Sequence, residues 1–333
     1  MKLYFALILV VPALVFGQEN FTFSHDGISR QYIYYSPDKL EENAPLVFVG
    51  HGYSGTAQGM MNSCTMNELA DNYGFAVCYP EGTVDGSGNN FWNVGYDFHQ
   101  NETVDDVGFI LSLAVYLQET YSLSVENTFA TGMSNGGELC YLLACQSNGK
   151  IKAVAPVAGG IWYNFLNDNG CNPKVPMPLF IKHGTNDDVT LYEGDVTDDY
   201  WGAYLSVDSI VSIFLNQHSF TDLVIDTMPN LNNNQRITIR SKYSSPLNYK
   251  QLWLYKYENG GHNWGADDYS VEEEIWEFFS LMMSTPSTIH SYIKDRKSIR
   301  RVDFLGRDVQ PKNNSLFIDF YDDGTVEKRL IID

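Results

Sequence analysis

The chain has 333 residues, of which 44% are hydrophobic and 19% are charged. This is the length and composition of a globular protein with one large α/β core and room for a small appendage. The formal net charge of -20 argues against nucleic acid as a partner, because binding to phosphate needs a basic face.

The N-terminus has the pattern of a secretory signal. Lys2 supplies a positive start, residues 3–16 are apolar throughout, and residues 15–17 offer a cleavage site before Gln18. The apolar run is too short for a membrane span, and no later segment approaches the roughly 20 apolar residues that a span requires. We therefore expect residues 1–17 to be removed and the protein to be secreted or held at the cell surface, with no stable membrane span.

Short apolar runs alternate with amphipathic helix patterns through residues 18–285. This alternation indicates parallel strands joined by crossover helices, and the order is that of an α/β-hydrolase with a mainly parallel central sheet flanked by helices. Strands are predicted at 21–24, 30–35, 46–50, 75–79, 128–131, 153–157, 179–182 and 252–257, and helices at 60–73, 104–121, 136–146, 207–216 and 272–283. Residues 220–248 fit less well, and they could form an excursion loop or an extra strand at 236–239.

The composition changes at 284–287, a stretch typical of a linker. We expect residues 286–333 to form this linker and a small β-rich module without catalytic groups. Two strand-like runs, 316–321 and 326–332, flank an Asp-Asp-Gly-Thr turn at 322–325, which is a strong hairpin signal.

The Gly-Met-Ser-Asn-Gly sequence at 132–136 predicts a nucleophile elbow. A strand-like run precedes it and a helical run follows it, which is the context that a serine needs to project its hydroxyl from a sharp turn. Ser134 is therefore the candidate nucleophile.

A serine hydroxyl needs a neighbouring imidazole to accept its proton, and in this fold the acid and then the histidine follow the serine. His262 comes directly after the predicted strand 252–257, in a loop with two glycines that can bring its ring over Ser134. Asp187 follows the strand 179–182 and is the candidate acid, with Asp188 as the alternative. His218 and His290 lie in less suitable contexts, and His183 is expected to brace the acid loop or to be a core histidine.

The oxyanion hole requires backbone N–H groups that point at the developing charge. We expect one from Asn135, which follows the nucleophile, and one from Tyr53, in the loop after the strand 46–50. His51 is interpreted as structural. The walls of the substrate pocket are expected to include Trp92, Trp162 and residues of the 220–248 segment.

Five cysteines in an exported protein make disulfides plausible, and their odd number leaves at least one without a partner in the chain. No Cys-x-x-Cys motif or Cys/His cluster is present, so no metal site is predicted. The proposed chemistry requires no cofactor.

Several motifs together resemble one family. The chain resembles the secreted esterases of the polyhydroxybutyrate depolymerase and feruloyl esterase group over roughly residues 20–285. The motifs, in order, are His51-Gly52, Tyr79-Pro80-Glu81-Gly82, Trp92-Asn93, Val104-Asp105-Asp106-Val107-Gly108-Phe109, Gly132-Met133-Ser134-Asn135-Gly136-Gly137, His183-Gly184-Thr185-Asn186-Asp187 and Gly261-His262.

The resemblance implies the same nucleophile, acid and base as the argument from the residues: Ser134, Asp187 and His262. It also implies a disulfide between Cys145 and Cys171. A second pair, Cys64 with Cys78, is a weaker expectation and would leave Cys140 free. The chain departs from the family at 189–199, which is acidic where the family is proline-rich.

The last forty or so residues resemble the sorting domains of the Bacteroidetes type IX secretion system, through residues 302–307 and 323–328. This resemblance implies that the type IX machinery is a partner, and that the protein crosses the periplasm before its release or attachment to the surface.

The leading hypothesis is a secreted serine carboxylester hydrolase that acts on feruloyl or acetyl esters of polysaccharides, or on short-chain polyesters. The alternative is a non-catalytic carbohydrate-binding or adhesion protein on a hydrolase scaffold, since aromatic residues make up 14% of the chain. A serine peptidase ranks third, because no large N-terminal domain is present to gate peptides.

Overall fold

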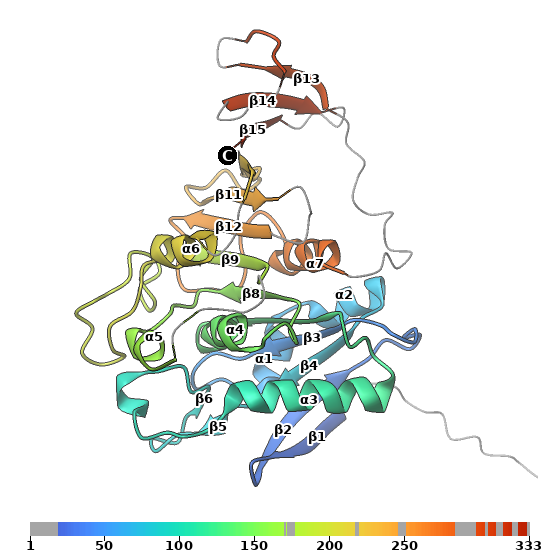
Figure 1. Cartoon of the computed structure of the whole chain (residues 1–333), viewed down its shortest axis with the longest axis vertical. Helices are drawn as coiled ribbons and strands as arrows, with labels where there is room; N and C mark the ends of the chain where they lie inside the picture. Colours follow the sequence, from blue (N-terminus) through green and yellow to red (C-terminus); the bar gives the residue numbers. More distant parts are fainter. Residues whose placement is uncertain are drawn as a thin grey trace, which may run out of the picture.

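A central sheet runs through the whole computed structural model (Figure 1). The structure describes residues 19–169, 171, 177–216, 220–245, 251–283, 298–303, 306–310, 316–321 and 326–331. The predicted signal at 1–17, His218, the linker from 284 with His290, and the hairpin turn at 322–325 lie outside the described residues.

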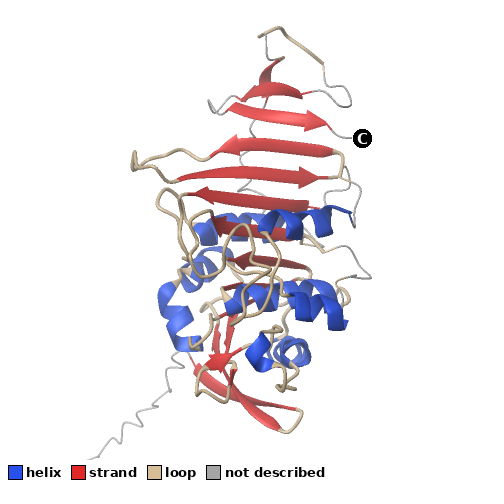
Figure 2. Cartoon of the chain, turned by 90° about the vertical axis from the view of Figure 1, so that its left-hand side faces the viewer, coloured by secondary structure: helices blue, strands red, loops and turns tan. Residues whose placement is uncertain are grey.

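Thirteen of the described strands form one sheet, in the order β1-β2-β4-β3-β7-β8-β9-β12-β11-β10-β15-β14-β13 (Figure 2). The strands are β1 (Glu19–His25), β2 (Ile28–Tyr35), β3 (Leu46–Gly50), β4 (Ala76–Pro80), β7 (Thr128–Met133), β8 (Ala153–Val157), β9 (Leu179–Gly184), β10 (Asp222–Thr227), β11 (Ile237–Ser244), β12 (Gln251–Glu258), β13 (Ser298–Val302), β14 (Leu316–Tyr321) and β15 (Val326–Ile331). The six central strands, from β4 to β12, are parallel, and the pairs outside them are antiparallel. The predicted α/β-hydrolase sheet is therefore confirmed.

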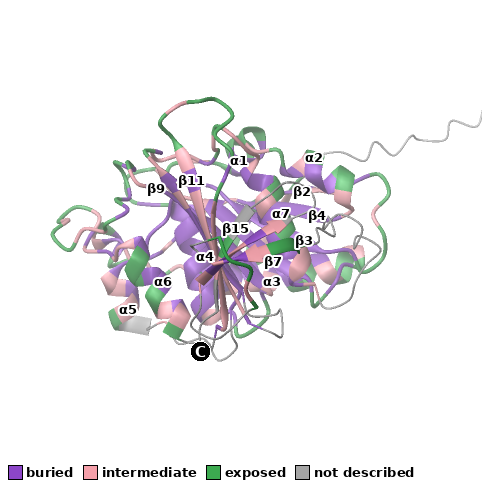
Figure 3. Ribbon diagram, turned by 90° about the horizontal axis from the view of Figure 1, so that it is seen from above, coloured by how far each residue is buried: buried purple, intermediate pink, exposed green. Residues whose placement is uncertain are grey.

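Two hydrophobic cores lie on opposite faces of this sheet, because successive strand side chains point to opposite sides. In β3, Leu46 and Phe48 pack into one core, and Val47 and Val49 pack into the other. Figure 3 shows the buried residues along the strands and the exposed ones on the outer sides of the helices. The first core is covered by α3 (Asp106–Tyr121), α4 (Asn135–Gln146), α5 (Tyr163–Asn169) and α6 (Val207–Asn216), and the second by α1 (Ala57–Ser63), α2 (Met66–Tyr73) and α7 (Val271–Leu281).

Several elements differ from their sequence-based prediction. The helix predicted at 60–73 is two helices, because extended backbone at Cys64 ends α1 before α2 begins. The 220–248 segment contributes two strands, β10 and β11, rather than a loop or one strand. The short helix α5 was not predicted, nor was the small hairpin of β5 (Thr83–Val84) and β6 (Asn90–Phe91).

The C-terminal strands continue the main sheet. β15 pairs with β10 in antiparallel register, from Asp222↔Ile331 to Ile225↔Lys328. In Figure 1 the strands β13 to β15 lie at one end of the molecule, beyond β11 and β12. No helix among the described residues is long and apolar enough to cross a membrane.

One disulfide is present, between Cys145 at the end of α4 and Cys171, as the family resemblance implied. The weaker expectation of a Cys64–Cys78 bond is wrong, since both cysteines are free, and so is Cys140. Cys78 is fully buried within β4, whereas the Cys64 sulfur lies 3.8 Å from the Tyr79 hydroxyl.

Candidate active site

Ser134 stands on a sharp turn between β7 and α4. Its backbone angles are φ 55° and ψ -124°, a conformation that a residue with a side chain rarely adopts. The turn is closed by the flanking glycines, because a Cβ at Gly136 would lie 2.3 Å from the Gly50 carbonyl oxygen and one at Gly132 would lie 2.6 Å from that of Gly136. The strand-to-helix turn at Ser134 therefore has the strained backbone that a nucleophile elbow requires.

The imidazole of His262 faces the carboxylate of Asp187. His262 Nδ1 lies 2.8 Å from Asp187 Oδ2 and 3.0 Å from Oδ1. Asp187 is 3% exposed, and its Oδ1 also accepts hydrogen bonds from the backbone N–H groups of Val189 and Thr190. Burial raises the pKa of Asp187, but the hydrogen bond and charge of His262 outweigh it, and the pKa is lowered overall. The structure thus pairs His262 with Asp187, and the alternative Asp188 is exposed.

The sheet brings the three residues to one edge. Ser134, Asp187 and His262 follow the ends of β7, β9 and β12, which are parallel strands, with β8 between the first two. Among the described residues, no hydrogen bond joins Ser134 Oγ to His262. Catalytic hydrogen bonds are often long without substrate and shorten in the complex.

Two buried basic residues of β9, Lys182 and His183, hold the loops that carry His262 and Asp187. The Lys182 ammonium donates to Asn263 O, Asn263 Oδ1 and Gly265 O at 2.7–2.8 Å, directly after His262. Burial lowers the pKa of Lys182 to about 7, although the charge of Asp187 raises it in part. His183 Nε2 lies 2.7 Å from Thr190 O and 3.4 Å from Asp187 Oδ2, so His183 braces the acid loop.

His51 orders the loop expected to form the oxyanion hole. Its Nε2 accepts from the Gly82 N–H at 2.9 Å, so its proton is on Nδ1, which donates to Gly52 O at 2.8 Å. Burial lowers the pKa of His51 to about 4, which keeps the ring neutral. Because the C=O and N–H of a trans peptide point in opposite directions, the Tyr53 N–H points away from His51. Gly52 itself adjoins the nucleophile, since a Cβ there would lie 3.3 Å from Ser134 Cβ.

Trp92 and Trp162, predicted to contact substrate, support the site from within. Trp92 is 0% exposed and Trp162 is 3% exposed, so neither ring reaches a ligand in this structure. The Trp92 indole N–H donates to His51 O at 2.9 Å, and that of Trp162 donates to Trp201 O at 2.8 Å. The prediction is corrected: both indoles are held inside because their N–H groups bond to backbone of the site loops.

A buried acid in the first turn of α4, Glu138, was not predicted as a site residue. Its Oε2 lies 2.5 Å from the Tyr96 hydroxyl and 3.3 Å from Asn135 Nδ2. Burial raises the pKa of Glu138 to about 8. The only signal in the sequence is that Glu138 is the one charged residue of α4, two residues after the elbow, and Lys182 is likewise a charged residue that follows three apolar residues of β9.

A second buried pair holds the loop that carries Trp92. Arg30 Nη2 lies 2.8 Å from Asp106 Oδ1, and Asp106 Oδ2 accepts from the Asn93 N–H at 2.7 Å. Burial raises the pKa of Asp106, with Arg30 lowering it in part. These bonds join the Trp92-Asn93 motif to the Asp-Asp-Val-Gly motif at 105–108. The role of both motifs is to position the loop that carries Trp92.

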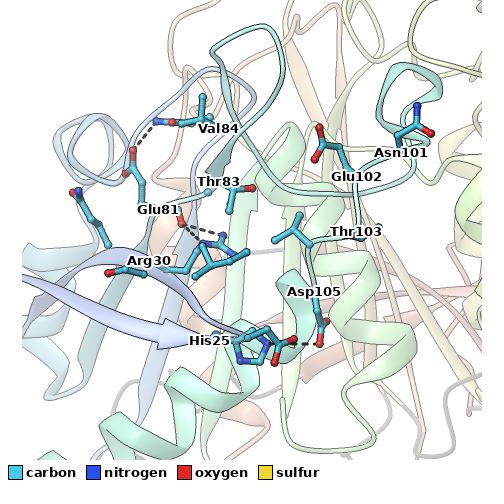
Figure 4. Close-up of a pocket in the computed structure, with 16 residues that line it drawn as sticks. His25, Arg30, Glu81, Thr83, Val84, Asn101, Glu102, Thr103 and Asp105 are labelled. Carbon is cyan, nitrogen blue, oxygen red and sulfur yellow. Dashed lines mark hydrogen bonds and ion pairs between the residues drawn. The ribbon is translucent and has the colours of Figure 1, made fainter.

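A cavity of about 730 Å³ lies at the tip of the β1–β2 hairpin. Figure 4 shows His25, Arg30, Glu81 and Asp105 around it, and Ser134 is not among its lining residues. His25, Asp26 and Asp105 have ligand atoms within 4.8 Å of one another. His25 Nε2 lies 3.6 Å from Asp26 Oδ2 and 3.7 Å from Asp105 Oδ2, and Asp105 also caps α3.

Comparisons with known proteins show similarity to esterases. Residues 30–195 match the family model described as Esterase PHB depolymerase. The chain is 28% identical over 167 residues to a bifunctional acetylxylan esterase/xylanase of Neocallimastix patriciarum, and 30% identical over 169 residues to a probable feruloyl esterase C of Aspergillus clavatus. Each match covers 50% of this chain, but only 23% and 58% of these relatives.

A solved structure shows the same fold. The acetyl xylan esterase from Aspergillus awamori superposes with a TM-score of 0.55 at 15% identity, over 80% of this chain and 99% of that one. A carboxylesterase of Bacillus cereus superposes with a TM-score of 0.50 at 14% identity, over 76% of this chain and 95% of that one. The chain therefore has the α/β-hydrolase fold.

Proposed function

We propose that this chain is a carboxylic ester hydrolase that works through Ser134, His262 and Asp187. The matches to an esterase family and to feruloyl and acetylxylan esterases support the hydrolase class. The observation that carries the assignment is the His262–Asp187 pair of 2.8 Å at the same sheet edge as a serine on a strained elbow.

In the proposed reaction, His262 Nε2 accepts the Ser134 proton while Oγ attacks the ester carbonyl carbon. Asp187 keeps the other imidazole proton on Nδ1 and stabilises the imidazolium that forms. The imidazolium then protonates the leaving alcohol as the C–O bond of the ester breaks, which leaves an acyl group on Ser134. Water, deprotonated by His262, attacks this acyl-enzyme and releases the acid.

The negative oxygen of the tetrahedral intermediate is assigned to the N–H groups of Asn135 and Tyr53. Asn135 is the first residue of α4, where backbone N–H groups have no acceptor within the helix and the helix dipole favours an anion. His51 holds the Gly52–Tyr53 peptide in place. No step requires a cofactor or a metal.

The proposed substrates are feruloyl or acetyl esters of polysaccharides, as in the names of the relatives, or short-chain polyesters. The test is the turnover of p-nitrophenyl acetate by the wild type and by Ser134→Ala, His262→Ala and Asp187→Asn, followed by methyl ferulate, acetylated xylan and poly(3-hydroxybutyrate) in parallel. We expect kcat to fall by about 10³-fold or more in the Ser134 and His262 variants. Undiminished turnover in Ser134→Ala contradicts the assignment.

Secretion through the type IX system is also proposed, supported by the resemblance of residues 302–307 and 323–328 to its sorting domains and by the signal pattern at 1–17. The mature protein recovered from the medium or the cell surface is expected to begin at Gln18. N-terminal sequencing checks this, and a mature start at Met1 contradicts it.

A further inference from the structure

Beside the nucleophile lies a group of four aromatic rings, Tyr53, Phe98, Tyr200 and Trp201, here called the aromatic platform. Tyr200 is 63% exposed and Phe98 is 38% exposed, and their centroids are 5.2 Å apart. Trp201 lies between the others, 5.3 Å from both of these rings and 5.4 Å from Tyr53. Large exposed aromatic side chains in contact with one another are unusual on a surface without a ligand.

The platform is rigidly supported. The Asp198 carboxylate accepts from the N–H groups of Tyr200 and Trp201, both at 2.8 Å. The Trp201 carbonyl accepts from the Asp97 N–H at 3.0 Å and from the Trp162 indole. A preformed surface binds without the entropic cost of ordering its side chains.

The platform is continuous with the catalytic loops. Tyr53 follows Gly52, which adjoins Ser134, and the Tyr53 hydroxyl is fixed by Asp85 at 2.7 Å. Trp201 also packs on Tyr96, whose hydroxyl contacts Glu138 under the elbow. A chain bound to the platform would therefore extend from the ester held at Ser134.

Charge limits what can bind there. The sequence has no Lys or Arg between Lys39 and Lys150 or between Lys182 and Arg236, and these stretches contain the loops of the platform. The same loops carry carboxylates instead: Asp97, Asp195, Asp198 and Asp199. An anionic polymer would meet repulsion from these carboxylates, and the loops themselves supply no Lys or Arg to offset it.

Hydrogen-bond chemistry distinguishes between the remaining ligands. Carboxylates only accept hydrogen bonds, so a partner must donate them. The hydroxyl groups of a sugar donate, whereas the esters of an aliphatic polyester only accept. The C–H faces of pyranose rings also pack on aromatic rings. Asp199 is exposed next to Tyr200, in a position to receive such hydroxyls.

We propose that the aromatic platform is a subsite for a neutral saccharide chain that bears the ester cleaved at Ser134. This deepens the proposed function, because it names a neutral carbohydrate as the polymer and excludes acidic polysaccharides and polyesters. The part that concerns binding does not depend on catalysis and can be measured without it.

The test uses the full chain with Ser134→Ala, titrated calorimetrically with xylohexaose, cellohexaose and trigalacturonate, and mixed with poly(3-hydroxybutyrate) granules. Tyr200→Ala and Phe98→Ala are added singly to this background. The matched control is Tyr116→Ala, an aromatic residue on α3 that is 42% exposed and packs on Phe23. We expect affinity for at least one neutral oligosaccharide to fall about tenfold in the two platform variants and to stay unchanged in the control.

The same platform variants with Ser134 intact should hydrolyse p-nitrophenyl acetate within twofold of the wild type, and have a raised KM for acetylated xylan. Asp199→Lys should strengthen trigalacturonate binding. The proposal is overturned if the platform variants bind the saccharides as tightly as the control. It is also overturned if trigalacturonate binds as tightly as the neutral sugars, or if the platform substitutions reduce only the adsorption to poly(3-hydroxybutyrate) granules. If the wild type does not cleave p-nitrophenyl acetate, the esterase proposal fails, while the titrations still decide the platform.

Discussion

The side chain of Asn135 and the backbone of Trp92 form a reciprocal pair of hydrogen bonds. Trp92 N–H donates to Asn135 Oδ1 at 2.7 Å, and Asn135 Nδ2 donates to Trp92 O at 3.0 Å. The residue after Ser134 is thereby tied to the loop that Arg30 and Asp106 hold from the other side. One asparagine both begins α4 and sets the distance between the elbow and its covering loop.

Asn135→Ala should lower the free energy of unfolding by about 3 kcal/mol, because it leaves a buried N–H and a buried carbonyl of Trp92 without partners. The activity should fall as well, since the elbow loses its support. Urea unfolding monitored by fluorescence checks the stability. The control is Asn62→Ala, an exposed amide on α1 that bonds only Gln58 in the structure and should change stability by less than about 0.5 kcal/mol. Equal unfolding free energies of Asn135→Ala and Asn62→Ala would contradict this interpretation.

Gly52→Ala tests the space in front of Ser134. The new methyl would lie 3.3 Å from Ser134 Cβ and 3.8 Å from Oγ, where the carbonyl of the substrate has to approach. We expect kcat/KM for p-nitrophenyl acetate to fall by about 10²-fold, comparable to the loss of an oxyanion-hole donor.

The matched control for this change is Gly86→Ala, because a Cβ at Gly86 meets no atom within 4 Å. Its kcat/KM and melting temperature should equal those of the wild type. Full activity in Gly52→Ala would show that the substrate does not bind over this loop.

The buried acid Glu138 makes stability depend on pH. Burial raises the folded pKa of Glu138 to about 8 from its ordinary value of 4.5, so between these values the folded state holds a proton that the unfolded state has lost. Its contribution is complete below about pH 4.5 and is lost as the pH rises toward 8, by about 1.4 kcal/mol for each pH unit.

Glu138→Gln removes this titration and keeps the shape of the side chain. As the pH rises from 5 to 8, the unfolding free energy of the wild type should therefore fall relative to that of Glu138→Gln. Urea unfolding at four pH values measures it. Parallel pH profiles for the two proteins would contradict a protonated Glu138.

The Cys145–Cys171 disulfide closes a loop with a sequence separation of 26 residues. By the chain-entropy model, its removal should cost roughly 3–4 kcal/mol of stability. The melting temperature with and without dithiothreitol measures this in the wild type. A Cys145→Ala/Cys171→Ala variant should have the same lowered melting temperature with and without dithiothreitol. A further decrease of this temperature with dithiothreitol would point to another disulfide bond.

Patterns along the sequence predicted the central strands and most helices, because hydrophobic periodicity is a local signal, and the same patterns led to the proposed triad. Contacts across the fold had no such signal. The burial of Trp92 depends on the His51 carbonyl, 41 residues away, and the position of Lys182 depends on Asn263. The addition of β15 to β10 joins segments about a hundred residues apart, whereas composition alone suggested a separate module.

The central claim is that Ser134 is the nucleophile activated by His262. The most direct measurement is labelling of the full chain with a fluorophosphonate, followed by peptide mapping by mass spectrometry. We predict one phosphonyl adduct on Ser134, absent from Ser134→Ala and at least a hundredfold slower to form in His262→Ala. An adduct on another residue, or ester hydrolysis with no adduct on Ser134, would contradict the assignment.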